Sequence, residues 1–182
     1  MSGLKRHVVW WAMIAGMSVS GTVWSDESVP AGYRAVATEN GIPYTLFYAV
    51  ALTESGKPVG VTRHYRPWPW TLNVAGQGYF FDSRLAAWQA LTVWLEQGKR
   101  SIDIGLMQVN WRYHRERLST PWQALDPYFN LRVGAKILQE CYFTRQDWWA
   151  SVGCYHAPGD SQRAKQYRRR VVSRWQQLVN AG

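Results

Sequence analysis

The chain has 182 residues and a formal net charge of +9, and 47% of its residues are apolar while only 18% are charged. This length allows one domain, and the composition excludes a disordered chain or a low-complexity scaffold. The surplus of 21 Lys and Arg over 12 Asp and Glu predicts an acidic partner, for which nucleic acid, anionic lipid and an anionic cell-wall polymer all qualify.

Residues 1–25 have the pattern of a secretory signal peptide. Basic residues come first, the apolar run 8–17 follows, and small residues lead to a polar segment. We therefore expect export and a mature domain that spans residues 26–182. The alternative is an uncleaved anchor over residues 8–24, because a membrane span needs about 17 to 25 residues.

Hydrophobic spacing and helix breakers predict a mostly helical domain after this segment. Gly41, Gly56 and Gly98 end the first three apolar stretches, and Pro43 stands where the first turn of a helix tolerates proline. Residues 68–81 instead alternate around a glycine-containing turn, which predicts a β-hairpin. Apolar residues at helical spacing predict helices over residues 30–40, 44–54, 83–98, 130–143, 147–155 and 161–180.

The two cysteines, Cys141 and Cys154, fall in the fourth and fifth of these helices. In an oxidising compartment such a pair predicts a disulfide, and two adjacent helices would bring the two residues within reach of each other. A zinc site would need two further ligands, and His64, His114 and His156 lack ligand spacing, so we expect no metal.

Glu54 is the one charged residue of the helix expected over residues 44–54, which is apolar almost all round and therefore buried. A lone carboxylate at the end of a buried helix is unfavourable unless it is paired, hydrogen-bonded or protonated. Glu54 is thus a candidate acid of raised pKa, as catalytic acids in apolar pockets are. The alternative is a side chain that turns out to solvent at the end of the helix.

The last expected helix, over residues 161–180, is strongly basic. One stripe of it is apolar, and its members are Ala164, Tyr167, Val171, Trp175 and Leu178. Basic residues occupy much of the rest, at positions 163, 165, 168, 169, 170 and 174. We interpret it as a solvated amphipathic surface helix, with a dedicated binding helix as the alternative.

Short motifs in a fixed order resemble a known enzyme family. Residues 51–56 surround Glu54 as Ala-Leu-Thr-Glu-Ser-Gly, residues 105–108 read Gly-Leu-Met-Gln, and residues 154–159 read Cys-Tyr-His-Ala-Pro-Gly. This order resembles the lysozyme-like lytic transglycosylases of the soluble-lytic-transglycosylase type. Residues 101–110 also look like the small members that open the cell wall locally for secretion and conjugation machines. The resemblance implies a mainly α, lysozyme-like α+β fold, in which a helical domain carries a small β-hairpin beside the active-site cleft.

The resemblance implies roles for the matching positions. Glu54 would be the single catalytic acid and base, acting on the glycosidic oxygen between N-acetylmuramic acid (MurNAc) and N-acetylglucosamine (GlcNAc) in peptidoglycan. The Tyr155 hydroxyl would lie beside this carboxylate, and no cofactor is expected. The residues implied in substrate binding are Ser55, Met107, Gln108, Asn110 and Tyr155.

The chain departs from the family pattern at His156, which stands where members usually have Asn, and at Pro158, which is extra. Asp103 matters for the mechanism, because its surroundings are also similar to the segment of animal lysozymes that supplies a second carboxylate. A hydrolytic muramidase would use Asp103 as that second carboxylate. A lytic transglycosylase needs only Glu54, since the 6-hydroxyl of the muramic sugar attacks its own anomeric carbon. We favour the lytic reaction, with Asp103 bonding to nearby loop amides.

Aromatic residues near the hairpin and the Gly105 motif are candidates for stacking on sugar rings. They are Trp68, Trp70, Tyr79, Trp111 and Tyr113. Core packing is the alternative for each of them, and it is the interpretation that we favour for Trp88, Trp94 and Trp175.

The expected partner is the glycan strand of peptidoglycan, with components of a secretion or conjugation machine as further candidates. Export to the periplasm disfavours nucleic acid as a partner, and membrane contact would require an uncleaved N-terminal segment. A non-catalytic wall-binding or assembly module, in which the fold survives without the chemistry, is the alternative to an enzyme.

Overall fold

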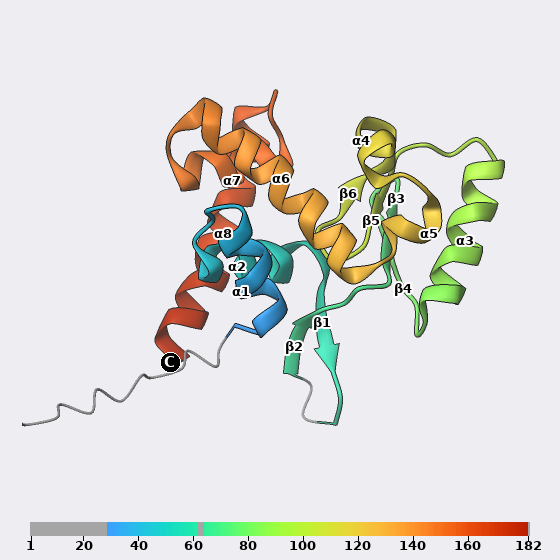
Figure 1. Ribbon diagram of the computed structural model, residues 1–182, viewed down its shortest axis with the longest axis horizontal. Helices are drawn as coiled ribbons and strands as arrows, with labels where there is room; N and C mark the ends of the chain where they lie inside the picture. Colours follow the sequence, from blue (N-terminus) through green and yellow to red (C-terminus); the bar gives the residue numbers. More distant parts are fainter. Residues whose placement is uncertain (1–28, 62–63, 182) are drawn as a thin grey trace, which may run out of the picture.

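Helix α2 (Tyr44–Ser55) is the buried centre of the computed structural model, which describes residues 29–61 and 64–181. Seven consecutive residues, Leu46 to Leu52, are buried, as the apolar sequence predicts. Helices α1 (Ala31–Glu39) and α8 (Ser161–Ala181) pack against it (Figure 1). The prediction of a buried central helix is therefore confirmed.

Two small antiparallel sheets follow α2. The first pairs β1 (Gly56–Val59) with β2 (His64–Pro67). The second has the order β4-β3-β5-β6, and its strands are β3 (Thr71–Val74), β4 (Gln77–Phe80), β5 (Ile102–Ile104) and β6 (Val109–Asn110). Its β3–β4 hairpin turns at Ala75 and Gly76, both at positive φ (51° and 89°), as a tight two-residue turn requires. The hairpin expected over residues 68–81 is confirmed, whereas β1, β2, β5 and β6 add strands that were not predicted.

The remaining helices begin at side-chain caps. They are α3 (Arg84–Glu96), α4 (Trp111–Leu118), α5 (Pro121–Ala124), α6 (Pro127–Arg145) and α7 (Trp148–His156). Ser83 accepts a hydrogen bond from the Ala86 N–H and so caps α3. Asp126 caps α6 in the same way, and this cap explains why α6 begins three residues before the expected start at residue 130.

Helix α6 lies between two groups of elements (Figure 1). On one side are α1, α2, α7 and α8, and on the other are the four-stranded sheet and helices α3 to α5. A single cluster of buried apolar residues extends through both groups, from Phe47 in α2 to Leu72 and Ile104 in the sheet and Leu138 in α6. This mainly α architecture with small sheets is the predicted fold class.

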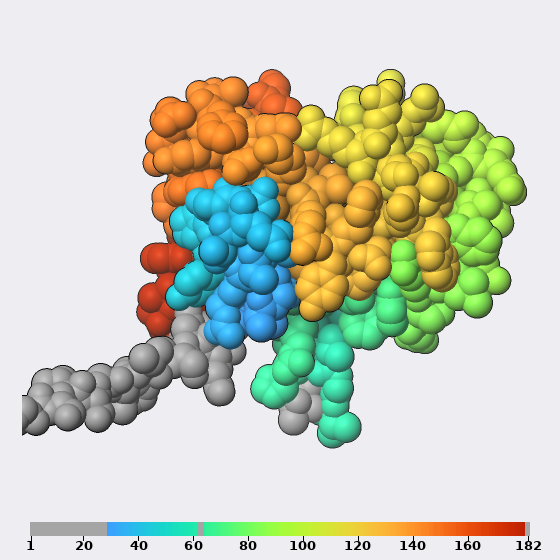
Figure 2. Space-filling model, in the orientation of Figure 1, coloured from blue at the N-terminus to red at the C-terminus, as the bar shows by residue number. Residues whose placement is uncertain are grey.

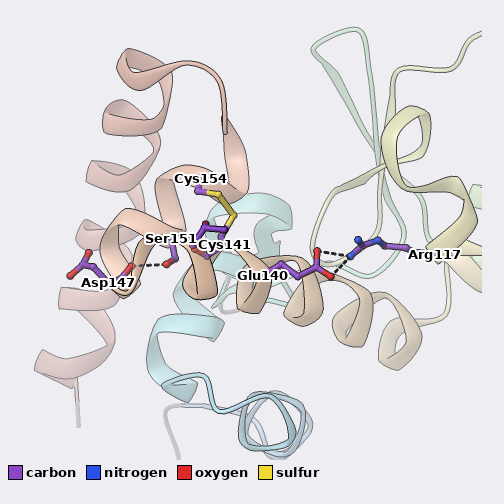
Figure 3. The surroundings of a disulfide bond; sticks show 7 residues. Arg117, Glu140, Cys141, Asp147, Ser151 and Cys154 are labelled. Carbon is purple, nitrogen blue, oxygen red and sulfur yellow. Dashed lines mark hydrogen bonds and ion pairs between the residues drawn. A yellow bond between two sulfur atoms is a disulfide. The ribbon is translucent and has the colours of Figure 1, made fainter.

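A disulfide joins Cys141 of α6 to Cys154 of α7, with their Cα atoms 5.9 Å apart (Figure 3). This pairing confirms the prediction from the two adjacent helices. The predicted signal segment, residues 1–25, lies outside the described residues. Of the helices that the structure describes, none has the length and apolar character needed to cross a membrane.

Candidate active site

A cleft of about 910 Å³ opens between the two groups of elements. Figure 2 shows the surface hollowed between the orange part that holds α6 and α7 and the yellow part that holds α4. The predicted site residues that line this cleft are Glu54, Asp103, Gln108, Asn110 and Tyr155. Residues from three separate stretches of the sequence are thus brought to one cavity. Across residues 29–61 and 64–181, no group of three or more His, Cys, Asp or Glu could hold a metal ion.

Glu54 reaches the cleft from the last turn of α2, and only 12% of its side chain is exposed. Burial raises the pKa of Glu54 from its ordinary 4.5 to about 8. The Tyr167 hydroxyl lowers this pKa, the charge of Asp103 raises it, and the charge of Arg170 lowers it. Burial dominates, so the carboxyl group carries a proton at neutral pH.

Tyr167 faces Glu54 from α8 and is almost fully buried, at 1% exposure. Its hydroxyl forms no hydrogen bond of standard geometry within the described residues, yet it lies close enough to the carboxyl group to lower the pKa of Glu54. Burial raises the pKa of Tyr167 itself, so the phenol stays neutral. The sequence pattern predicts Tyr167 only as a member of the apolar stripe of α8, so its place at the site is an addition from the structure.

His156 lies against both of these groups at the end of α7. Its ring stacks on the Tyr167 ring, with centroids 4.2 Å apart and planes 3° apart. Its Nδ1 is 3.9 Å from Glu54 Oε1. Burial and the charges of Arg170 and Arg163 lower the pKa of His156 to about 4. At neutral pH the contact therefore joins a neutral imidazole to a protonated carboxyl group and is not an ion pair.

Ser55 and Met107 lie behind the cleft and not among the described residues that line it. Ser55 is 1% exposed, and its hydroxyl donates a hydrogen bond to the Leu106 carbonyl at 2.7 Å. Met107 is fully buried, and its N–H donates to Asn130 Oδ1 at 2.9 Å. Both residues therefore tie the 105–108 loop to its surroundings, and their expected part in substrate binding stays a prediction.

Asn130 holds the 105–108 loop from α6. Its Nδ2 donates to the carbonyls of Ile104 and Ala124, in addition to the bond that its oxygen accepts from Met107. Gly105 has a φ of 80°, and a Cβ there would meet the Asn130 side chain at 2.6 Å. The glycine of the motif is therefore required by both its backbone conformation and the close approach of Asn130. No motif in the sequence marks Asn130 as a residue of the site.

Tyr155 and Gln108 also fix this loop while lining the cleft. The Tyr155 hydroxyl donates to the Met107 carbonyl at 2.6 Å. Burial and the neighbouring carboxylates Glu54 and Asp103 raise the pKa of Tyr155 well above its ordinary value. Gln108 Nε2 donates to the carbonyls of Thr71 and Gly105 at 3.1 and 3.0 Å. Both side chains present their remaining surface to the cleft.

Asp103 and Asn110 lie opposite each other on β5 and β6. Asn110 Nδ2 donates to Asp103 Oδ1 at 2.7 Å, and Asn110 Oδ1 accepts from the Arg112 N–H. Burial raises the pKa of Asp103, and the bond from Asn110 lowers it. Asp103 is therefore a half-buried carboxyl group that is held by an amide within the same cleft as Glu54.

Of the aromatic candidates for sugar stacking, Tyr113 lines the cleft and is 73% exposed. The others make protein contacts. Trp68 donates its indole N–H to the Phe81 carbonyl and packs edge-on against Trp70. Tyr79 packs against Trp94, and the partly buried Trp111 packs against the core.

The comparison with protein-family models agrees with this geometry. The model of the transglycosylase SLT domain matches residues 33–176 and so includes α2, the sheet, the 105–108 loop and most of α8. The searches of curated proteins and of solved structures gave no match. Because the matched region covers most of the chain, the protein belongs to the transglycosylase SLT domain family, whose members are lytic transglycosylases that act on peptidoglycan.

Proposed function

We propose that this protein cleaves the β-1,4 bond between MurNAc and GlcNAc and leaves a 1,6-anhydro-MurNAc end. The observation that carries the proposal is Glu54, a buried carboxyl group in a cleft of about 910 Å³ with a pKa of about 8. A general acid must hold its proton at the working pH, and burial ensures that Glu54 does so.

The proposed reaction uses Glu54 twice. The protonated carboxyl group gives its proton to the glycosidic oxygen, and the bond from that oxygen to the MurNAc anomeric carbon breaks. The 6-hydroxyl of the same sugar then attacks this carbon, and the Glu54 carboxylate takes the hydroxyl proton. The ring closes and Glu54 is protonated again, so no water is consumed. Intramolecular attack has a high effective molarity, which favours this route over hydrolysis.

The residues around Glu54 divide into two groups in this proposal. Gln108, Asn110 and Tyr155 line the cleft and contact the sugar through their polar groups. Ser55 and Met107 act from behind it as positioning residues, because their hydrogen bonds to Leu106 and Asn130 hold the 105–108 loop.

A hydrolytic muramidase is the second candidate, because Asp103 lines the same cleft and its charge acts on Glu54. In such an enzyme Asp103 would attack the anomeric carbon and form a covalent intermediate. In the protein, however, Asp103 Oδ1 accepts a hydrogen bond from the Asn110 amide. This bond supports a structural role for Asp103.

The test is the chemistry of the sugar ends released from purified peptidoglycan. We expect products lighter by one water than reducing muropeptides. Glu54→Gln should lower the rate about 10³-fold, as expected for loss of a general acid, while Asp103→Asn should keep it within about tenfold. Reducing ends together with an inactive Asp103→Asn variant would establish the hydrolase. Normal binding of wild-type protein to the wall without any released product would establish a non-catalytic module.

The proposed setting is the periplasm, where the mature domain over residues 26–182 would open the wall for an envelope-spanning secretion or conjugation system. The signal pattern of residues 1–25 and the similarity of residues 101–110 to small members of this kind support the setting. The mass of the protein recovered from the periplasm tests cleavage. The role in the machine is tested by measuring transfer in cells that lack the protein. The same measurement is made in such cells after a Glu54→Gln copy is supplied.

A further inference from the structure

A second cavity, of about 500 Å³, lies on α7, α8 and the end of α6. We name it the basic groove, and its polar and aromatic lining residues are Arg145, Trp149, Ser161, Lys165 and Arg168. Residues 157–159 line both the basic groove and the active-site cleft. The two cavities therefore lie on either side of one short loop.

The basic groove has a lining with one sign of charge. Arg145, Lys165 and Arg168 line it, and no Asp or Glu does so among the described residues. None of the ion pairs within the part of the chain that the structure describes involves these three cations. Cationic side chains without a counter-charge attract anions, and guanidinium groups bind carboxylates with particular strength.

The floor of the basic groove is rigid and partly apolar. Gly153 of α7 approaches α8 so closely that a Cβ there would lie 3.2 Å from the Ala164 Cβ. Trp149 packs edge-on against Trp175, which fixes its ring at the groove. Cys154 is bound to α6 by the disulfide (Figure 3). It lines both cavities. The groove is thus preformed, and its apolar surface suits small aliphatic side chains beside an anionic group.

The basic residues of α8 differ in what their side chains contact. Arg170 and Arg174 lie over tyrosine rings, 5.3 and 4.1 Å from the ring centroids. Arg163 lines the active-site cleft, whereas Lys165 and Arg168 line the basic groove. Lys165 is exposed, as expected for an amphipathic surface helix, and Lys165 and Arg168 are the cations of this helix that line the basic groove.

We infer that the basic groove binds the carboxylates of the peptide stems carried by the glycan strand in the cleft, an inference that rests on the proposed function. The muramic sugars bear stems that leave the glycan sideways, and these stems combine carboxylates with small aliphatic side chains. A strand at Glu54 needs only to direct one stem across residues 157–159 to place carboxylates beside Arg145, Lys165 and Arg168. The charge and the apolar floor of the groove both fit this ligand.

The experiment measures binding in a Glu54→Gln background, so that it does not depend on turnover. Two variants of equal charge change are compared. Lys165→Gln with Arg168→Gln alters the basic groove, and Arg115→Gln with Arg169→Gln alters exposed cations that line neither cavity. The ligands are soluble glycan strands with stems, the same strands with amidated stem carboxylates, and strands freed of stems, which keep the lactyl carboxylate of each muramic sugar.

We expect the groove variant to bind stem-bearing strands about tenfold more weakly, the effect of two charge-assisted contacts. The control variant should bind them within about twofold of the parent. Amidation of the stem carboxylates should weaken binding to the Glu54→Gln parent as much as the two groove substitutions do. Stem-free strands should bind the parent and the groove variant equally well. Equal losses on stem-bearing and stem-free strands, equal losses in the control, or no effect of amidation would each overturn the inference. Turnover of wild-type protein, measured separately, tests the proposed function.

Discussion

The buried carboxyl group of Glu54 should destabilise the folded protein at neutral pH, and Glu54→Gln should relieve this effect. The pKa of Glu54 is about 8 in the folded protein against an ordinary 4.5. Because one pH unit corresponds to about 1.4 kcal/mol for a single proton, the full difference amounts to about 5 kcal/mol. Gln has nearly the same shape and does not titrate, so it removes this contribution.

The direction in which stability changes with pH depends on whether the folded protein or the unfolded chain binds the Glu54 proton more tightly. The folded protein holds the Glu54 proton better than the unfolded chain does, so its contribution to stability is complete below pH 4.5. That contribution is lost as pH rises from 4.5 through about 8. The stability gained by Glu54→Gln should be close to zero at pH 4, about 3 kcal/mol at pH 7 and about 5 kcal/mol at pH 9.

Urea unfolding of wild-type protein and of the variant across pH 4 to 9 measures this difference directly. Glu96→Gln is the matched control, because Glu96 is an exposed carboxylate at the end of α3. Its effect should stay within about 0.5 kcal/mol, as for an ordinary surface site. A difference in unfolding free energy between wild type and Glu54→Gln that stays constant between pH 5 and 8 would refute the reasoning. It would mean that water reaches the carboxylate in the folded protein.

Three further predictions concern the same site. The catalytic rate constant should fall as pH rises through about 8, because Glu54 then loses the proton that it must donate; a flat rate from pH 6 to 9 would contradict its role as acid. Tyr167→Phe should move this alkaline limb to higher pH, since the hydroxyl lowers the pKa of Glu54, and an unmoved limb would mean that the hydroxyl does not act on the carboxyl group. Replacing Cys141 and Cys154 by Ser should lower the free energy of unfolding by about 3 kcal/mol in urea titrations, while an unchanged midpoint would show that the disulfide does not stabilise the fold.

Local pattern was enough to predict several of the elements that carry the site, although not β5 and β6, which hold Asp103 and Asn110. The apolar run before Glu54 predicted a buried helix, and α2 spans Tyr44–Ser55. Glycine and alternating residues predicted the β3–β4 hairpin, whose turn falls at Ala75 and Gly76. These successes share a cause, since each pattern is decided by neighbours in sequence. The start of α6 was missed because its cap, Asp126, stands before the apolar repeat begins.

Features that depend on packing between distant segments could not be predicted from local sequence pattern. The stripe on α8 indicated that Tyr167 is buried, but only the rotation of α8 against α2 decides that its hydroxyl faces Glu54. Asn130 lies in the first turn of α6 and belongs to no motif, although it forms hydrogen bonds with Met107, Ile104 and Ala124. Lys165 is exposed like its neighbours Arg163 and Gln166, and only the groove that α7 forms beside it sets it apart.

His156, the residue that departs from the family pattern, completes the electrostatic account of the site. Burial, together with the charges of Arg170 and Arg163, keeps its imidazole neutral above about pH 4, while burial keeps Glu54 protonated up to about pH 8. A protonated imidazole 3.9 Å from the Glu54 oxygen would favour the carboxylate and weaken its hold on the proton. Arg170 therefore has two opposite effects on Glu54: its charge lowers the pKa of Glu54 directly, and together with Arg163 it helps to keep His156 neutral, so that His156 does not lower that pKa further. Between these two pH values the proton stays on the carboxyl group, where the proposed reaction requires it.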